Sequence, residues 1–259
     1  MPIAKRRPNW YLAAEALTPV EEHGGYLVKR DDLAEERGVR GGKARVLGVI
    51  CRHIEAVGMR GLTTHTSRYS VTPEALGAVC CAYGIAACVH TAASAEPMSE
   101  AFKNAVRYGV RVVEHRPGYM SVLASRAKKQ AEEDGYMEVG LGLSFPAATV
   151  EIAKQVDNLP RNIKRLVTSV GSGRQLEGII MGLERIGFDI PVLGVCVGSI
   201  PDCIVNLETP LQVELRKIAT PYGRPAKVSR LGNLELNPYY AAKCIEYLLP
   251  DDLLWVVAK

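Results

Sequence analysis

The segment YLVKRDDLAEERGVRGGKARVL, residues 26–47, decides how the chain begins to fold. Residues 26–30 have the apolar composition of a short strand, and residues 44–56 carry apolar side chains at helical spacing. Lys43 lies just before that helix and follows Gly41 and Gly42. Because flexible backbone lets a lysine approach a bound carbonyl group, Lys43 is a candidate nucleophile. The segment therefore predicts a strand, a turn and a helix with a reactive amine at its start.

A second glycine-rich turn, Gly171-Ser172-Gly173, follows a strand-like apolar run over residues 166–170. Such a turn at the start of a helix can hold a phosphate, because the first backbone N–H groups of the helix have no partner within it. Pyridoxal phosphate is a cofactor that needs both a lysine amine and a phosphate site. The two motifs together make an enzyme with an aldehyde cofactor the leading hypothesis.

Composition limits the class of protein. A chain of 259 residues with 47% apolar and 23% charged residues is typical of a globular protein with one large domain or two small ones. A net charge of +4 gives little support for nucleic-acid binding, and the basic triplet at residues 5–7 is expected to be a solvated tail. Seven cysteines without metal-site spacing predict reduced thiols, a cytoplasmic location and no metal site.

No membrane segment or secretory signal is expected. The N-terminus lacks an apolar signal core, because charged and polar residues interrupt it. Residues 75–95 contain no lysine, arginine, aspartate or glutamate, but Gly84 lies at their middle. We therefore expect a helix that ends at Gly84, followed by a buried strand.

Strand-like and helix-like segments alternate along the chain in the order that builds a parallel sheet. No repeat or linker separates two halves, so two lobes would have to be interwoven. The expected strands are 26–30, 62–66, 85–90, 110–114, 166–170, 192–197 and 253–257; the expected helices are 44–56, 73–83, 97–108, 121–134, 145–156, 178–186, 204–217 and 238–248, with a loop over 221–230.

The order of motifs resembles the fold-type-II pyridoxal-phosphate enzymes, which are tryptophan synthase β-like, and within them the branch of 1-aminocyclopropane-1-carboxylate deaminase and D-cysteine desulfhydrase. The resemblance implies an α/β fold of two interwoven lobes with mainly parallel sheets flanked by helices. It also implies a larger cofactor-binding lobe (1–50 and 141–259), a smaller lobe (51–140) and a homodimer. The segments similar to the branch are 26–33 (its KRDDL turn), 41–47 (GGNKxRKL), 70–73 (SNH), 169–175 (TGSGGTxAG), 221–225 (GYGxP) and 237–243 (DPVYTGK).

The resemblance also implies roles for individual residues. Lys43 would form the Schiff base with pyridoxal phosphate, and its freed amine would move the proton at or near the α-carbon of an amino-acid-like substrate. The function implied is that of a lyase or deaminase. The phosphate would be held by Gly171, Ser172, Gly173, Arg174 and Gln175, while Ser70, Thr72 and Tyr222 would face the substrate, with Ser70 and Tyr222 as candidate catalytic residues.

Several cofactor-contact positions depart from the branch. Val71 replaces the asparagine that lies beside the ring oxygen of the cofactor in the branch. The position at which the branch has an acid next to the ring nitrogen falls near Gly232 in this chain. Arg174 and Gln175 interrupt the usual phosphate turn, although an arginine can bind phosphate as a charged fork. The closing TGG motif has no counterpart.

Two other functions stay open because of these departures. In the first, the fold binds a phosphorylated metabolite, a nucleotide or a modified nucleic-acid base without a covalent bond, with Lys43 and Arg174 as anion ligands. In the second, the chain is a non-catalytic scaffold for a partner. Nucleic acid is an expected partner only in the first of these two readings.

Overall fold

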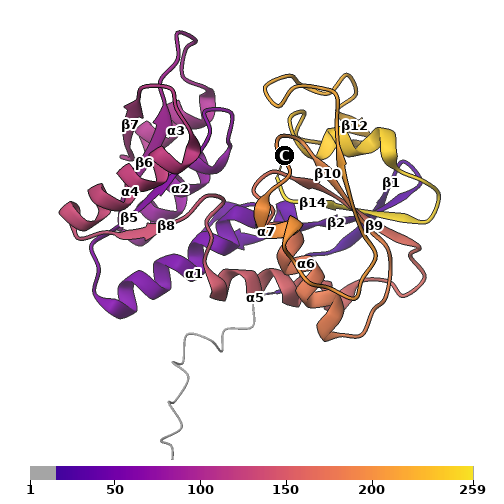
Figure 1. Cartoon of the computed structure of the whole chain (residues 1–259). Coiled ribbons are helices and arrows are strands. Elements are labelled where there is room, and N and C mark those ends of the chain that lie inside the picture. Colours follow the sequence, from indigo (N-terminus) through magenta and orange to yellow (C-terminus); the bar gives the residue numbers. More distant parts are fainter. Residues whose placement is uncertain (1–15, 259) are drawn as a thin grey trace, which may run out of the picture.

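The computed structural model describes residues 16–258, so the basic triplet at residues 5–7 lies outside the described residues (Figure 1). Two sheets form two lobes, one with six strands in the order β1-β2-β14-β9-β10-β11 and one with four in the order β7-β6-β5-β8. Figure 1 shows the two sheets side by side, with helix α1 (Gly42–Val57) running between them. The chain thus has the predicted α/β architecture of two lobes with mainly parallel sheets flanked by helices.

The six-stranded sheet forms the large lobe. Strand β1 is antiparallel to β2, and the remaining neighbours are parallel. Its central strands are buried along their whole length, which agrees with their apolar sequences, because both faces of a parallel sheet are covered. The strands are β1 (Val20–His23), β2 (Tyr26–Arg30), β14 (Asp252–Val256), β9 (Arg165–Val170), β10 (Val192–Cys196) and β11 (Val213–Lys217).

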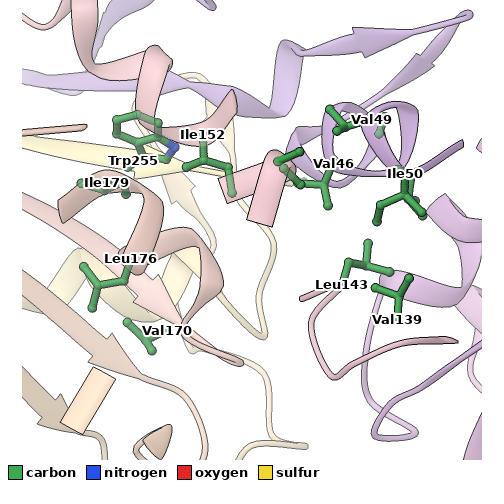
Figure 2. Packing of buried hydrophobic residues seen from close by; sticks show 14 of the residues in the cluster. Val46, Val49, Ile50, Val139, Leu143, Ile152, Val170, Leu176, Ile179 and Trp255 are labelled. Carbon is green, nitrogen blue, oxygen red and sulfur yellow. The ribbon is translucent and has the colours of Figure 1, made fainter. Parts of the chain in front are cut away.

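Helices and short elements cover the two faces of this sheet. Figure 2 shows Ile152, Leu176 and Ile179 packed with Val170 and Trp255 on the face covered by α5 (Pro146–Lys154) and α6 (Arg174–Arg185). A second apolar cluster lies on the opposite face, with β12 (Arg230–Leu231), β13 (Leu234–Glu235) and the 3-10 helix η4 (Ala241–Tyr247). The short elements near β2 and α5 are η2 (Asp31–Leu33), β3 (Glu35–Glu36), β4 (Val39–Arg40) and η3 (Gln155–Asn158).

The four-stranded sheet forms the small lobe, and all its strands are parallel. Helix α2 has a proline in its first turn and ends at Gly84, whose φ of 68° is left-handed, so residues 75–95 are a helix and a strand as predicted. Among the described residues, we find no helix with the length and apolarity needed to cross a membrane. The elements are β5 (Gly61–His65), β6 (Ala86–Ala92), β7 (Arg111–His115), β8 (Met137–Val139), α2 (Thr72–Tyr83), α3 (Glu100–Arg107) and α4 (Met120–Asp134).

A shared apolar core joins the lobes. Val46 and Ile50 on α1 belong to the same buried cluster as Val139 and Leu143, and Figure 2 shows these side chains facing one another. Full burial of an aliphatic side chain such as Ile50 contributes roughly 1.5–3 kcal/mol. Helix α1 therefore fixes the position of one lobe against the other, and Lys43 lies in its first turn.

The prediction of one helix over residues 204–217 is wrong. The chain forms only the short helix α7 (Asp202–Val205), and β11 pairs in parallel with β10. Pro210 lies between them, and it lacks a backbone N–H and disfavours helix at the preceding residue. The predicted helix over 238–248 is instead the 3-10 helix η4, and α6 begins at Arg174 rather than at residue 178.

Candidate functional site

The start of α1 lies at the carboxyl edge of the large sheet. The N–H of Gly42 donates to the carbonyl of Val257, just after β14, at 2.9 Å. Gly41 has a φ of 121°, which side chains rarely permit, and a methyl group at Gly42 would lie 2.7 Å from a carboxylate oxygen of Asp31. The two glycines are therefore needed to bring Lys43 to the edge where parallel-sheet proteins bind ligands.

The Lys43 side chain is half-buried, and its amine has a single hydrogen bond in the described part of the chain. Its Nζ donates to the carbonyl oxygen of Gly142 at 3.3 Å. Burial lowers the pKa of the amine to about 8, because removing water disfavours the ammonium form. No carboxylate of the described residues pairs with it to restore that charge. A large fraction of the amine is thus neutral and nucleophilic near pH 8.

Gly142 connects this amine to the turn before α6. A methyl group at Gly142, whose φ is +74°, would lie 1.9 Å from the hydroxyl oxygen of Ser172, so the backbone there rests directly on Ser172. The carbonyl of the same residue accepts the Lys43 hydrogen bond. The lysine and the glycine-rich turn, far apart in sequence, therefore belong to one site.

The turn at residues 171–173 has the shape of an anion site. Gly173 has a left-handed φ of 87°, and the first N–H groups of α6 lack helical partners. Arg174 pairs with Glu177 through one guanidinium nitrogen at 2.7 Å. Its buried Nε has no hydrogen-bond partner among the described residues. Arg174, the residue that follows the predicted phosphate turn, thus has one donor without a protein partner.

Helix α7 covers one side of this turn. A methyl group at Gly173 would lie 2.7 Å from the sulfur of Cys203 and 2.8 Å from Ile204. The Cys203 thiol donates to the carbonyl of Ser172 at 3.3 Å. Figure 1 shows α7 beside α6, on the side that faces the small lobe. The open part of the turn is Gly171, which is exposed.

A buried carboxylate links the starts of α1 and α6. Asp31 accepts a hydrogen bond from Arg45 at 2.6 Å and one from the Gln175 amide at 3.4 Å. Gln175, predicted to bind the phosphate, is thus directed toward the end of β2. The sequence analysis did not predict this role of Asp31, although Asp31 and its partner Arg45 both lie in the segment 26–47. The link sets the distance between Lys43 and the turn.

Ser70 and Tyr222, the other predicted catalytic residues, meet at Tyr240. The hydroxyls of Tyr222 and Tyr240 are in hydrogen-bond contact, and their rings pack edge to face with centroids 5.8 Å apart. The Ser70 hydroxyl lies near the Tyr240 hydroxyl. Burial raises the pKa of Tyr240, so the phenol stays protonated. Tyr240 was not among the predicted site residues, although it lies in the segment 237–243 that resembles the DPVYTGK motif.

Two further positions lie beside these hydroxyls. The ring of Tyr240 packs on the anion turn, since a methyl group at Gly171 would lie 3.2 Å from it. Thr72, predicted to face the substrate, is buried as the first residue of α2, and its N–H donates to the Ser70 hydroxyl at 3.1 Å. Val71 precedes Thr72 at the N-cap of the helix, and its side chain has no group that can form a hydrogen bond.

The segment expected near the cofactor ring nitrogen lies elsewhere. Gly232 packs against Gly24, because a methyl group at Gly232 would lie 2.7 Å from the Gly24 nitrogen. Gly24 precedes β2, whereas Asp31 follows it, and five strand residues span roughly 16 Å. The β12–β13 hairpin therefore supplies no acid at the carboxyl edge.

Comparisons with known proteins agree on the fold. No family model matches the chain, and neither does any curated protein. A solved ACC deaminase homologue matches with a TM-score of 0.80 at 18% identity, over 95% of this chain and 90% of that one. An O-ureido-L-serine synthase matches at 0.64 and 15% identity, over 96% and 91%. The O-acetylserine dependent cystathionine beta-synthase of Helicobacter pylori matches at 0.62 and 18%, over 95% and 94%. The chain therefore has the tryptophan-synthase-β-like fold of the fold-type-II pyridoxal-phosphate enzymes.

Proposed function

We propose that the chain is a pyridoxal-phosphate enzyme of the lyase or deaminase type, acting at or next to the α-carbon of an amino-acid-like substrate. The observation that carries the proposal is the link between Lys43 and Ser172 through Gly142. It joins a desolvated amine to an anion-binding turn, and these are the two anchors that an aldehyde cofactor with a phosphate requires.

The donors of the site fit the two ends of this cofactor. Lys43 would hold it covalently, and the N–H groups at the start of α6 with the unpartnered Nε of Arg174 would hold its phosphate. When bound, the cofactor supplies an electron sink that stabilises negative charge at the α-carbon of an amino acid. The segment near Gly232, where the branch has an acid, supplies no acidic partner to the cofactor ring. This stabilisation is therefore expected to be weaker than in enzymes with an acid at that position.

The side chains of the site would then divide the work on the substrate. An amine with a pKa of about 8 is suited to take a proton from the α-carbon and return it near neutral pH, which is the part we give to Lys43. The hydroxyls of Ser70 and Tyr222 are uncharged donors that would orient oxygen atoms of the substrate. Gly142 lies against the amine, and α7 covers one side of the turn.

Spectroscopy of the full chain tests the proposal. Protein mixed with pyridoxal phosphate is expected to develop a visible absorbance band, and borohydride is expected to fix one cofactor mass on the chain. Lys43→Ala should abolish both signals, because no other amine occupies this place. The control Lys164→Ala, at an exposed lysine, should leave both unchanged. A wild-type chain that stays colourless and gains no mass would contradict the proposal.

Binding of a phosphorylated metabolite or nucleotide without a covalent bond is the second candidate function. The spare donor of Arg174 favours it, since it would serve any phosphate. Thermal unfolding with added AMP separates the two functions, because a ligand that binds only the native state raises Tm. For this second function AMP is expected to stabilise the wild type without uptake of pyridoxal phosphate, and to stabilise Lys43→Ala less, because Lys43 would be one of the anion ligands.

A further inference from the structure

One face of the small sheet carries titratable side chains. In the parallel register, His65 of β5 lies opposite His90 of β6, and Cys88 of β6 lies opposite Arg111 of β7. Side chains at alternate positions of a strand point to the same face of a sheet. All four strands therefore contribute polar groups to this one face, namely His65, Cys88, His90, Arg111, His115 and Glu138.

The two faces of this sheet are held in different ways. Leu62 and Val89 point to the opposite face and belong, with Leu76 of α2, to the apolar cluster that joins the lobes. Helix α4 packs on β5, β6 and β8 with a stripe of three buried side chains, Leu123, Ala127 and Ala131. None of these three belongs to either apolar cluster of the described residues. Helix α4 thus lies on the polar face with little apolar contact to hold it.

The charged groups around the histidines are mostly positive. They come from α4, β7 and β8, and they are Arg126, Lys128, Asp134, Arg111 and Glu138. Asp134, at the end of α4, is already paired with Arg111. The carboxylate of Glu138 lies 4.0 Å from Nδ1 of His65, beyond hydrogen-bond range. A further positive charge on this face is therefore unfavourable.

His90 and His115 share one hydrogen between two facing ring nitrogens. Nδ1 of His90 lies 2.8 Å from Nε2 of His115, and the rings are nearly parallel with centroids 5.0 Å apart. Such a contact needs an N–H on one ring and a bare nitrogen on the other. His90 is buried, and its second nitrogen faces the sulfur of Cys88 at 3.5 Å. Protonation of both rings would replace this hydrogen bond with two opposed N–H groups.

The fold resists protonation of these histidines. Burial, followed by the charges of His115 and Arg111, lowers the pKa of His90 to about 4. Burial also lowers the pKa values of His65 and His115. A histidine exposed to water has a pKa of about 6.5, so an opened face binds more protons than a closed one below that pH. The stability of the closed face is therefore lost as the pH falls from about 6.5 toward 4.

We propose that the pair His90–His115 is an acid-sensitive latch for α4, which holds the helix on the small sheet at neutral pH and releases it in mildly acidic solution while the lobes stay joined. The lobes stay joined because the cluster between them lies on the opposite face and is apolar. Helix α4 leads into β8 and then to Gly142, whose carbonyl accepts the Lys43 hydrogen bond. The latch does not rest on the proposed function, because it involves no contact with a cofactor.

Hydrogen exchange of the full chain, followed by mass spectrometry, tests the latch. Peptides from α4 (120–134) and α1 (42–57) are compared at pH 7.5 and pH 5.0, after correction for the intrinsic pH dependence of amide exchange. His90 alone is expected to raise the equilibrium constant for opening of the face about thirtyfold at pH 5.0. Protection of α4 should fall by at least that factor, whereas protection of α1 should change less than about threefold.

A double variant removes the titration and keeps polar groups in place. His90→Asn combined with His115→Gln puts an amide at each of the two facing positions, and amides take up no proton in this pH range. This variant is expected to lose most of the pH effect on α4. His23→Gln, at a histidine of the large lobe, is the matched control and should keep the whole effect. If the double variant does not fold, the comparison of α4 with α1 in the wild type still decides.

Each outcome bears on the latch. A fall in protection that is confined to α4 and is lost in the double variant supports it. Unchanged protection of α4 at pH 5.0 would overturn it. An equal fall in α4 and α1 would indicate acid unfolding of the whole chain and would overturn it as well. A fall in α4 that persists in the double variant would show that the histidine pair is not the group that titrates.

Discussion

Two lysines of the large lobe, the buried Lys29 and the half-buried Lys43, have similarly lowered pKa values and different surroundings. Burial lowers the pKa of both Lys29 and Lys43 to about 8. The Lys29 ammonium donates to the Thr18 carbonyl and to Asn158, both at 2.6 Å, and lies over the Trp255 ring. Lys43 has one bond of 3.3 Å. A lowered pKa therefore marks a reactive amine only where the amine is not already committed to structural partners.

The largest expected difference between the two lysines is chemical. After the full chain is treated with pyridoxal phosphate and borohydride, peptide mapping is expected to find the cofactor mass on the peptide with Lys43. The peptide with Lys29 should carry none, because its ammonium is buried and holds two short hydrogen bonds. Modification of both peptides, or of Lys29 alone, would break the comparison.

Stability should respond in the opposite order. Lys29→Met leaves the oxygens of Thr18 and Asn158 without the ammonium donor, and we expect a loss of about 2–3 kcal/mol in the free energy of unfolding. Lys43→Met removes one long hydrogen bond and a desolvated charge, so it should change the free energy of unfolding by less than about 1 kcal/mol. Urea denaturation of the two variants measures both values. Similar losses in both would show that Lys43 is structural as well.

The predicted phosphate turn is a further difference between the surroundings of Lys43 and Lys29. No such turn lies near Lys29 among the described residues. Arg174→Ala is expected to weaken binding of pyridoxal phosphate about tenfold, because a charge-assisted contact is lost. Binding of pyridoxal, which lacks the phosphate, should stay the same. Glu177→Gln frees Arg174 from its ion pair and should strengthen phosphate binding slightly. Equal effects on both cofactor forms would argue against a phosphate at this turn.

The smallest expected effect is on the pH dependence of cofactor attachment. Because the folded pKa of Lys43 is lowered from 10.5 to about 8, the neutral amine increases as pH rises toward 8 and then levels off. The attachment rate should rise about fivefold from pH 7 to pH 8 and little more above pH 9, whereas an ordinary lysine keeps gaining neutral amine well beyond pH 10. Stopped-flow absorbance measures the rate. A steady rise through pH 10 would place the Lys43 amine in water.

Local patterns predicted much of the fold, and distant contacts explain what they missed. The glycines at 41–42 and at 171 and 173 led us to predict the two segments that would bind the cofactor. The sequence was sufficient here because the tight backbone conformations at these glycines depend on local residues. The roles of Gly142 and Tyr240 depend on neighbours that are far away in the chain, so no spacing reveals them. The false helix over 204–217 came from helical spacing that ignored Pro210. Motif order assigned the ring-nitrogen position to the segment near Gly232, but motif order says nothing about the packing of Gly232 on Gly24, which places this segment away from the carboxyl edge.

The place of β14 in the large sheet has a consequence for synthesis on the ribosome. Strand β14 lies between β2 and β9, so most of the chain must be translated before β2 has its parallel neighbour. The small-lobe strands, by contrast, are made in one uninterrupted stretch from β5 to β8. The strands of the small lobe can therefore pair while translation continues, whereas β2 and β9 lack their shared neighbour until residues 252–256 have been made.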